Sequence, residues 1–198
     1  MSDLTTPRML APHVLDFCVK VSPNQQPIYL PAVPPELGEL PLECFENSRL
    51  RAERHGGEIV HGWVIWEWPR VMIEGEFHAV WRQKDGHLVD VTPRKDAEKK
   101  ILFLPQPSRA YEEMRVDNVR SSLSSDPAVT EYIAAAEEFY RVRTRGARIF
   151  QRLPDIPSSE WRSVYDRMLH SADEIRRNLK RRKSLTSALQ RTVQSGRL

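Results

Sequence analysis

Apolar and polar residues alternate with the two-residue period of a β-strand through the middle of the chain. Residues 58–68 (EIVHGWVIWEW) are rich in β-branched and aromatic side chains, which favour strands. Their alternation places Trp63 and Ile65 on one face and Trp66 and Trp68 on the other. The pattern therefore predicts one strand over this whole stretch.

The residues that follow predict a hairpin. Residues 71–82 and 87–91 have the composition of strands, and a Lys-Asp-Gly sequence at residues 84–86 favours a tight turn between them. One more short strand is expected over residues 100–104 (KILFL). The centre of the chain is therefore expected to form an antiparallel sheet.

Helical patterns lie on both sides of this sheet. Residues 42–55 (LECFENSRLRAERH) predict a helix, and the glycine pair at 56–57 marks its end. After residue 107 the apolar spacing becomes helical, and it predicts one helix over 126–146 and a second that starts near 158.

The first 42 residues hold eight of the fifteen prolines, so this segment is expected to be mostly extended or looping. Residues 14–21 (VLDFCVKV) alternate in polarity and predict a short strand with Cys18 on its more polar face. A second apolar patch follows at residues 28–30. The segment is too apolar for a disordered linker, and we expect it to pack along the core.

These patterns predict an α+β fold, in which a helix that bears Cys44 packs on an antiparallel sheet and a helical region follows. Three regions are expected. They are a proline-rich arm packed on the core at 1–41, the core at 42–107, and C-terminal helices with a basic tail at 108–198.

The net charge of +3 is unevenly distributed. Residues 176–197 contain eight Lys or Arg and no acid, which leaves about −5 for the rest of the chain. This tail is expected either to be a solvated helix end or to bind an acidic partner. It has no aromatic residue for base stacking, so nucleic acid is not the expected partner.

No apolar run is long enough to cross a bilayer, so no membrane span is expected. The first residues lack the basic and then apolar order of a secretory signal, and the expected location is the cytoplasm, or export by a route without such a signal. The two cysteines, Cys18 and Cys44, are too few for a disulfide framework, and each alone fits a small buried hydrophobic side chain.

Three residues have the chemistry of a catalytic triad: Cys44, His78 and Asp90. Cys44 falls in the first turn of the predicted helix, where the unpaired amides stabilise a thiolate. His78 and Asp90 lie on the two hairpin strands, directly across from one another if the loop spans about three residues. A one-residue change of register would put them on opposite faces of the sheet.

The order of these residues resembles the transglutaminase-like branch of the papain-like cysteine enzymes. That branch has a Cys at a helix N-terminus, a His in an H-A-W context and an Asp in a D-x-T context. The matching sequences here are ECFENS, FHAVW and DVTP, within residues 42–93. Three departures are a large residue on each side of Cys44, an inserted Val80, and a proline after Thr92 instead of before it.

The resemblance implies that Cys44 is the nucleophile, His78 the base and Asp90 the orienting group. The expected activity is hydrolysis or transfer at an amide or related acyl bond of a peptide or other amide substrate, without a cofactor. Trp66 and Trp68 are expected to form walls of the substrate cleft. The alternative is a non-catalytic protein-interaction module of the same fold, which docks through its basic C-terminal helices.

A metal site is a second hypothesis for this region. Glu74, Glu76 and His78 share one strand face, and His61 or His87 could join them. Alternate residues of one strand lie too far apart to bind one ion easily, and a solvated acidic face is the simpler interpretation. No metal is therefore expected.

Overall fold

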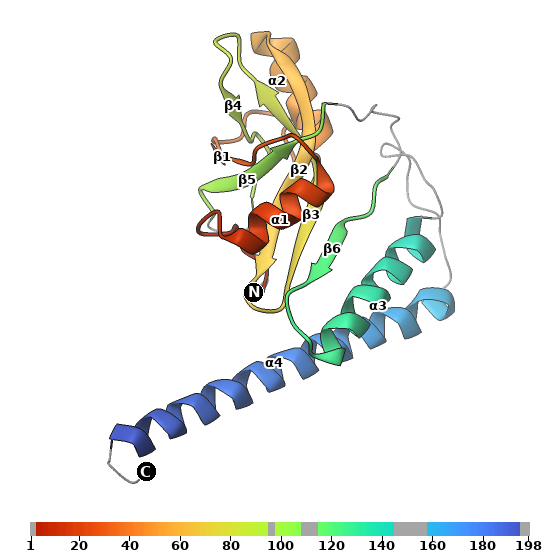
Figure 1. The fold of residues 1–198 in the computed structure, drawn as a ribbon. Coiled ribbons are helices and arrows are strands. Elements are labelled where there is room, and N and C mark those ends of the chain that lie inside the picture. The colour runs from red at the N-terminus through yellow and green to blue at the C-terminus, as the bar shows by residue number, and fades with distance from the viewer. Residues whose placement is uncertain (1–2, 95–97, 108–114, 145–157, 195–198) are drawn as a thin grey trace. The chain divides into compact units, whose positions relative to one another are not determined.

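The computed structural model describes residues 3–94, 98–107, 115–144 and 158–194, with the side chains of 188–189 and 191–194 left aside. The chain divides into two compact units (Figure 1). The first runs to Leu123, and the second begins at Ser124 and contains the two C-terminal helices. The predicted α+β class is confirmed, since helices and an antiparallel sheet are both present.

The first unit is built on one antiparallel sheet (Figure 1). Its strands follow the order β1-β5-β2-β3-β4, and β6 pairs with β3. Their bounds are β1 Ile28–Pro31, β2 Glu58–Trp68, β3 Met72–Arg82, β4 Leu88–Val89, β5 Lys100–Pro105 and β6 Val119–Ser122. The strands predicted over 58–68, 71–82 and 100–104 are therefore confirmed.

The two faces of β2 pack into different apolar clusters, as its alternation predicts. Trp63 and Ile65 contribute to a cluster that also contains Phe17. Val64 and Trp66 contribute to another cluster on the opposite side of the strand. Both faces of the central strands are thus covered, which holds the sheet in one register.

The prediction of a strand over 14–21 is wrong, because this segment belongs to helix α1, Pro12–Val21. Val14, Phe17 and Cys18 are its buried residues, and their three- and four-residue spacing is that of one helix face. Pro12 stands at the start of the helix, where its missing N–H costs nothing. Cys18 is 1% exposed and lies in the core, not on a polar face. The buried residues of α1 pack in one apolar cluster with Trp63 and Ile65 of β2.

The hairpin does not have the register that a loop of about three residues would give. Arg82 pairs with Leu88 and Trp81 with Val89, so His78 is not directly across from Asp90. The difference is two residues along the strand, which preserves the face on which each side chain lies. The predicted second strand, 87–91, is reduced to the two residues of β4.

Strand β6 has no counterpart among the sequence predictions. It pairs with β3 from Gly75–Val119 to Met72–Ser122. Its sequence, VRSS, contains one apolar residue, so neither alternation nor composition indicates a strand.

The second unit contains helices α3, Pro127–Thr144, and α4, Ser158–Gln194, and their predicted starts are confirmed. The rings of Phe139, Trp161 and Tyr165 pack together between them. Arg167 of α4 pairs with Glu131 and Glu138 of α3 at 2.8 and 2.9 Å. The predicted end of the first helix at 146 lies outside the described residues. Among the described residues, no helix is both long and apolar enough to cross a membrane.

Candidate active site

Cys44 is the first residue of helix α2, Cys44–His55. The chain cannot be helical just before it, since Leu42 has a φ of 70° and Glu43 has φ −108° and ψ 49°. The first helical bond runs from the Asn47 N–H to the Glu43 carbonyl at 2.8 Å. Cys44 therefore lies at the positive end of the helix, as predicted, and it is 8% exposed.

Two buried side chains of α2 fix the loop that leads into Cys44. The amide of Asn47 donates to the Leu40 carbonyl at 2.8 Å and accepts from the Leu40 N–H at 2.9 Å. One turn later, Arg51 pairs with the buried Glu39 and donates to the Pro34 carbonyl at 2.7 Å. The helix and its entry loop are thus held as one piece. Apart from a shared helix face for Asn47 and Arg51, no sequence pattern indicates these partners.

His78 of β3 and Asp90 meet in the core at one end of the sheet. His78 Nε2 lies 3.1 Å from Asp90 Oδ1, and the two residues are 5% and 0% exposed. The same carboxylate oxygen accepts the Thr92 N–H at 3.1 Å. The predicted pairing of imidazole and carboxylate is therefore present, although the side chains meet diagonally.

The backbone of Asp90 explains why β4 ends early. Asp90 leaves the hairpin ladder and forms a parallel bridge with Ala32, just after β1. Its N–H donates to the Pro31 carbonyl at 3.0 Å, and its carbonyl accepts the Val33 N–H at 2.9 Å. Asp90 is held on both sides of its backbone, which fixes the carboxylate against His78.

The electrostatics of the three residues are coupled. Burial lowers the pKa of His78, but the opposing charges and hydrogen bonds of Cys44 and Asp90 outweigh it and hold the pKa well above 6.5. Burial raises the pKa of Asp90, but the charge and hydrogen bond of His78 outweigh that effect. The pKa of Asp90 therefore lies below its ordinary value of 3.8. Because Nε2 is engaged by Asp90, Nδ1 is the ring nitrogen left for the thiol.

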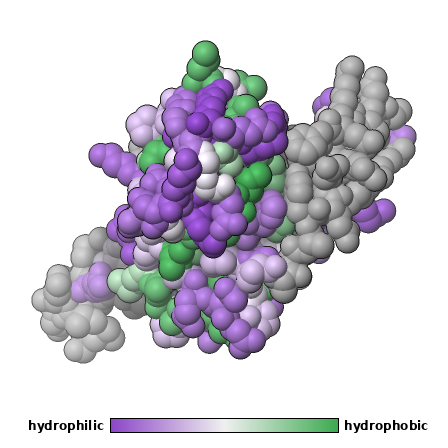
Figure 2. Space-filling model, turned by 90° about the horizontal axis from the view of Figure 1, so that it is seen from above, coloured by the Kyte–Doolittle hydropathy of each residue, from purple (hydrophilic) through white to green (hydrophobic). Residues whose placement is uncertain are grey.

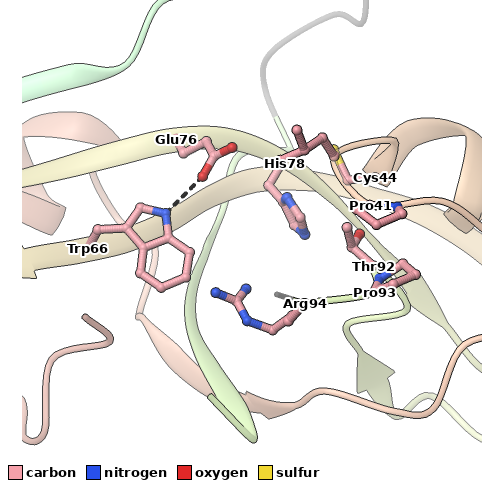
Figure 3. A pocket seen from close by; sticks show the side chains of 9 residues that line it. Pro41, Cys44, Trp66, Glu76, His78, Thr92, Pro93 and Arg94 are labelled. Atoms are coloured by element: carbon pink, nitrogen blue, oxygen red, sulfur yellow. Dashed lines mark hydrogen bonds between the residues drawn. The ribbon is translucent and has the colours of Figure 1, made fainter. Parts of the chain in front are cut away.

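Cys44 and His78 open into a cavity of about 220 Å³ (Figure 3). Its walls come from the entry loop of α2, from β2 and β3, and from the segment after Asp90. The lining residues are Pro41, Leu42, Cys44, Trp66, Glu76, His78, Thr92, Pro93 and Arg94. A thiol and an imidazole thus line one mostly apolar cavity.

Trp66, Glu76 and Arg94 form the far part of this cavity (Figure 3). The Trp66 indole N–H donates to Glu76 Oε2 at 2.8 Å. The Arg94 guanidinium lies 4.5 Å from the centre of the Trp66 ring and 3.7 Å from Asp90 Oδ2. Arg94 was missed from the sequence, and its spacing of four residues from Asp90 in DVTPR was the available signal.

The structure brings Cys44, His78, Asp90 and Trp66 together. Trp68 is buried near the end of β2 and is not among the residues that line the cavity. The wall formed by Pro41 and Leu42 was not predictable from the sequence, because it depends on how the loop enters α2.

The acidic strand face has separate partners. Glu74 is buried and lies 3.2 Å from the Arg120 guanidinium of β6, whereas Glu76 faces the cavity. Within the described ranges, no group of three or more His, Cys, Asp or Glu side chains could hold a metal ion.

Comparison of the chain with protein-family models, with curated proteins and with solved structures finds no match.

Proposed function

We propose that the protein is a cysteine-dependent hydrolase or transferase that acts on an amide or related acyl bond, with a peptide or similar amide as substrate. The observation that carries the proposal is that one buried imidazole interacts with both a thiol and a carboxylate. His78 contacts Asp90 at 3.1 Å, and the charges of Cys44 and Asp90 both favour its protonated form. This arrangement suits a thiolate–imidazolium pair.

In the first half-reaction the Cys44 thiolate attacks the carbonyl carbon of the substrate. The oxyanion develops beside the first amides of α2, which have no acceptor within a helix. His78 gives its proton to the leaving amine, and the carbon–nitrogen bond breaks. A thioester on Cys44 and a neutral imidazole remain.

In the second half-reaction His78 takes a proton from water or from an acceptor amine or alcohol. The activated oxygen or nitrogen attacks the thioester carbonyl, and the thiolate leaves, which restores the thiolate–imidazolium pair. Asp90 keeps the imidazole oriented with Nδ1 toward Cys44 and stabilises its positive charge. None of these steps requires a cofactor, and two free thiols suit the reducing cytoplasm.

Acylation by p-nitrophenyl acetate tests this proposal. The ester should transfer its acetyl group to Cys44 and release p-nitrophenolate, and peptide mass analysis should find one acetyl group on Cys44. Cys44→Ala should abolish the acetylation, whereas Cys18→Ala should leave it unchanged. An acetylation rate of wild-type Cys44 no faster than that of free cysteine would contradict the proposal.

A second candidate function, docking to an acidic partner, rests on helix α4. Its basic residues between Asn178 and Ser184 are all exposed, and no acid follows Glu174 in the chain. They are Lys180, Arg181, Arg182 and Lys183, preceded by Arg176 and Arg177. If this surface docks an acidic partner, truncation after Ile175 should remove the salt-sensitive binding of that partner. Binding that persists after the truncation would exclude this docking function.

A further inference from the structure

Most charges around the cavity are already paired. Arg94 lies 3.7 Å from Asp90 Oδ2, so its positive charge is offset by the carboxylate behind His78. In the proposed catalytic state, the Cys44 thiolate and the His78 imidazolium offset one another. The charges of Arg94, Asp90, Cys44 and His78 therefore sum to zero.

Among the charged side chains that line the cavity in the described part of the chain, Glu76 is the one without an opposite charge. It lies two residues before His78 on β3, and its side chain faces the same cavity (Figure 3). Its Oε2 accepts the neutral indole N–H of Trp66, which fixes the carboxylate without cancelling its charge. Its Oε1 has no hydrogen-bond partner among the residues that the structure describes. The neighbouring carboxylate, Glu74, is offset by Arg120 at 3.2 Å.

Much of the remaining wall of the cavity is apolar. Pro41, Leu42 and Pro93 line it together with the Trp66 ring. A cavity of about 220 Å³ with mainly apolar walls, in which Asp90 offsets the Arg94 charge and the Glu76 carboxylate is fixed, suits an aliphatic stem that ends in a cation.

From this arrangement we infer that the site takes amide or acyl substrates that carry an ammonium or guanidinium group near the scissile carbonyl. Glu76 is the specificity-determining residue, and Trp66 positions its carboxylate. The inference rests on the proposed function, because it names the substrate class of the same site.

Charge-selective thiol reagents test the inference. Trimethylammonium-ethyl and sulfonato-ethyl methanethiosulfonates differ mainly in charge, and each forms a mixed disulfide with a thiolate and releases methanesulfinate. The ratio of their rates at Cys44, located by peptide mass analysis, should exceed the same ratio for free cysteine about tenfold. Glu76→Gln should bring the ratio back to the free-cysteine value.

Glu58→Gln is the matched control. It removes the same charge from the exposed start of β2, where Glu58 pairs with Arg82, and it should leave the ratio unchanged. A ratio that Glu76→Gln leaves unchanged, or that Glu58→Gln lowers equally, would overturn the inference.

A measurement on the wild-type protein covers the case in which Glu76→Gln does not fold. N-acetyl-lysine amide should slow the alkylation of Cys44 by neutral iodoacetamide, whereas the uncharged N-acetyl-norleucine amide should slow it less. Equal protection by the two amides would overturn the inference. The proposed function is tested separately by the absolute rate of acetylation, since these charge ratios can be measured even on an unactivated thiol.

Discussion

The two cysteines of this chain occupy opposite chemical environments. Cys18 lies on the buried face of α1 among apolar side chains, and burial raises its pKa to about 11. Cys44 is nearly as inaccessible, at 8% exposure against 1%, but it begins a helix, contacts His78 and lines a cavity. The difference between the two thiols therefore comes from their neighbours and not from how deeply they are buried.

This comparison separates a structural cysteine from a candidate nucleophile. The described neighbours of Cys18 are apolar and do not stabilise a negative charge, so the protonated thiol packs as a small apolar group. Cys44 instead lies at the N-terminus of a helix and beside His78, and its charge is one of the causes that raise the pKa of that imidazole. Substitutions in the environment of one cysteine test this difference, because the other cysteine serves as the reference.

The largest expected effect comes from removing the imidazole. His78→Ala should slow alkylation of Cys44 by iodoacetamide at about pH 6 by about 100-fold, or about 2.7 kcal/mol, because the thiolate loses its counter-charge. His61→Ala, in the neighbouring strand β2, is the control and should leave the rate unchanged. An unchanged rate in His78→Ala would show that His78 does not activate the Cys44 thiol, which would then be unactivated like that of Cys18.

The next effect concerns stability. Cys18→Ser places a hydroxyl in an apolar cluster and should lower the free energy of unfolding by about 1–3 kcal/mol relative to Cys18→Ala. Urea unfolding of the two variants measures this difference. Neither variant should change the alkylation rate of Cys44, and a slower rate in both would show that the two environments are not independent.

The smallest expected effect is a pH dependence of stability. The folded-state pKa of His78 is above 6.5, so its contribution is complete below about pH 6.5 and is lost as the pH rises through the folded-state value. In a thiolate–imidazolium pair this loss is offset, because the Cys44 thiol of the unfolded chain takes up the proton that His78 releases. By urea unfolding, the free energy of unfolding of the wild-type protein and of Cys18→Ala should therefore change by less than about 1 kcal/mol between about pH 6.5 and about pH 8. A loss of more than about 1 kcal/mol per pH unit would show that His78 is protonated without a thiolate partner, which would contradict the ion pair.

Local patterns were enough to predict the central strands and the end of α2. The alternation over 58–68 matches β2, and the glycines at 56–57, both with positive φ, mark the end of α2 as expected. The strand prediction for 14–21 was wrong because the apolar residues of this segment fit both a two-residue period and a helical period. Without tertiary contacts, a short apolar run does not distinguish a helix from a strand.

The geometry of the site depends on long-range contacts that no local pattern encodes. Asp90 leaves the hairpin because Ala32, far earlier in the chain, pairs with it. Arg94 reaches the cavity only because Asp90 turns there, and Glu39 matters only because it meets Arg51. The residue types of the triad were thus predictable, whereas their register and their supporting side chains were not.

The most direct test of a Cys44–His78 ion pair is the ultraviolet absorbance of the thiolate as a function of pH. The wild-type protein should show the absorbance of one thiolate at about pH 6, where a free cysteine is protonated. That signal should disappear in Cys44→Ala and in His78→Ala and remain in Cys18→Ala. A wild-type protein without thiolate absorbance below about pH 8 would contradict the ion pair and the proposed function built on it.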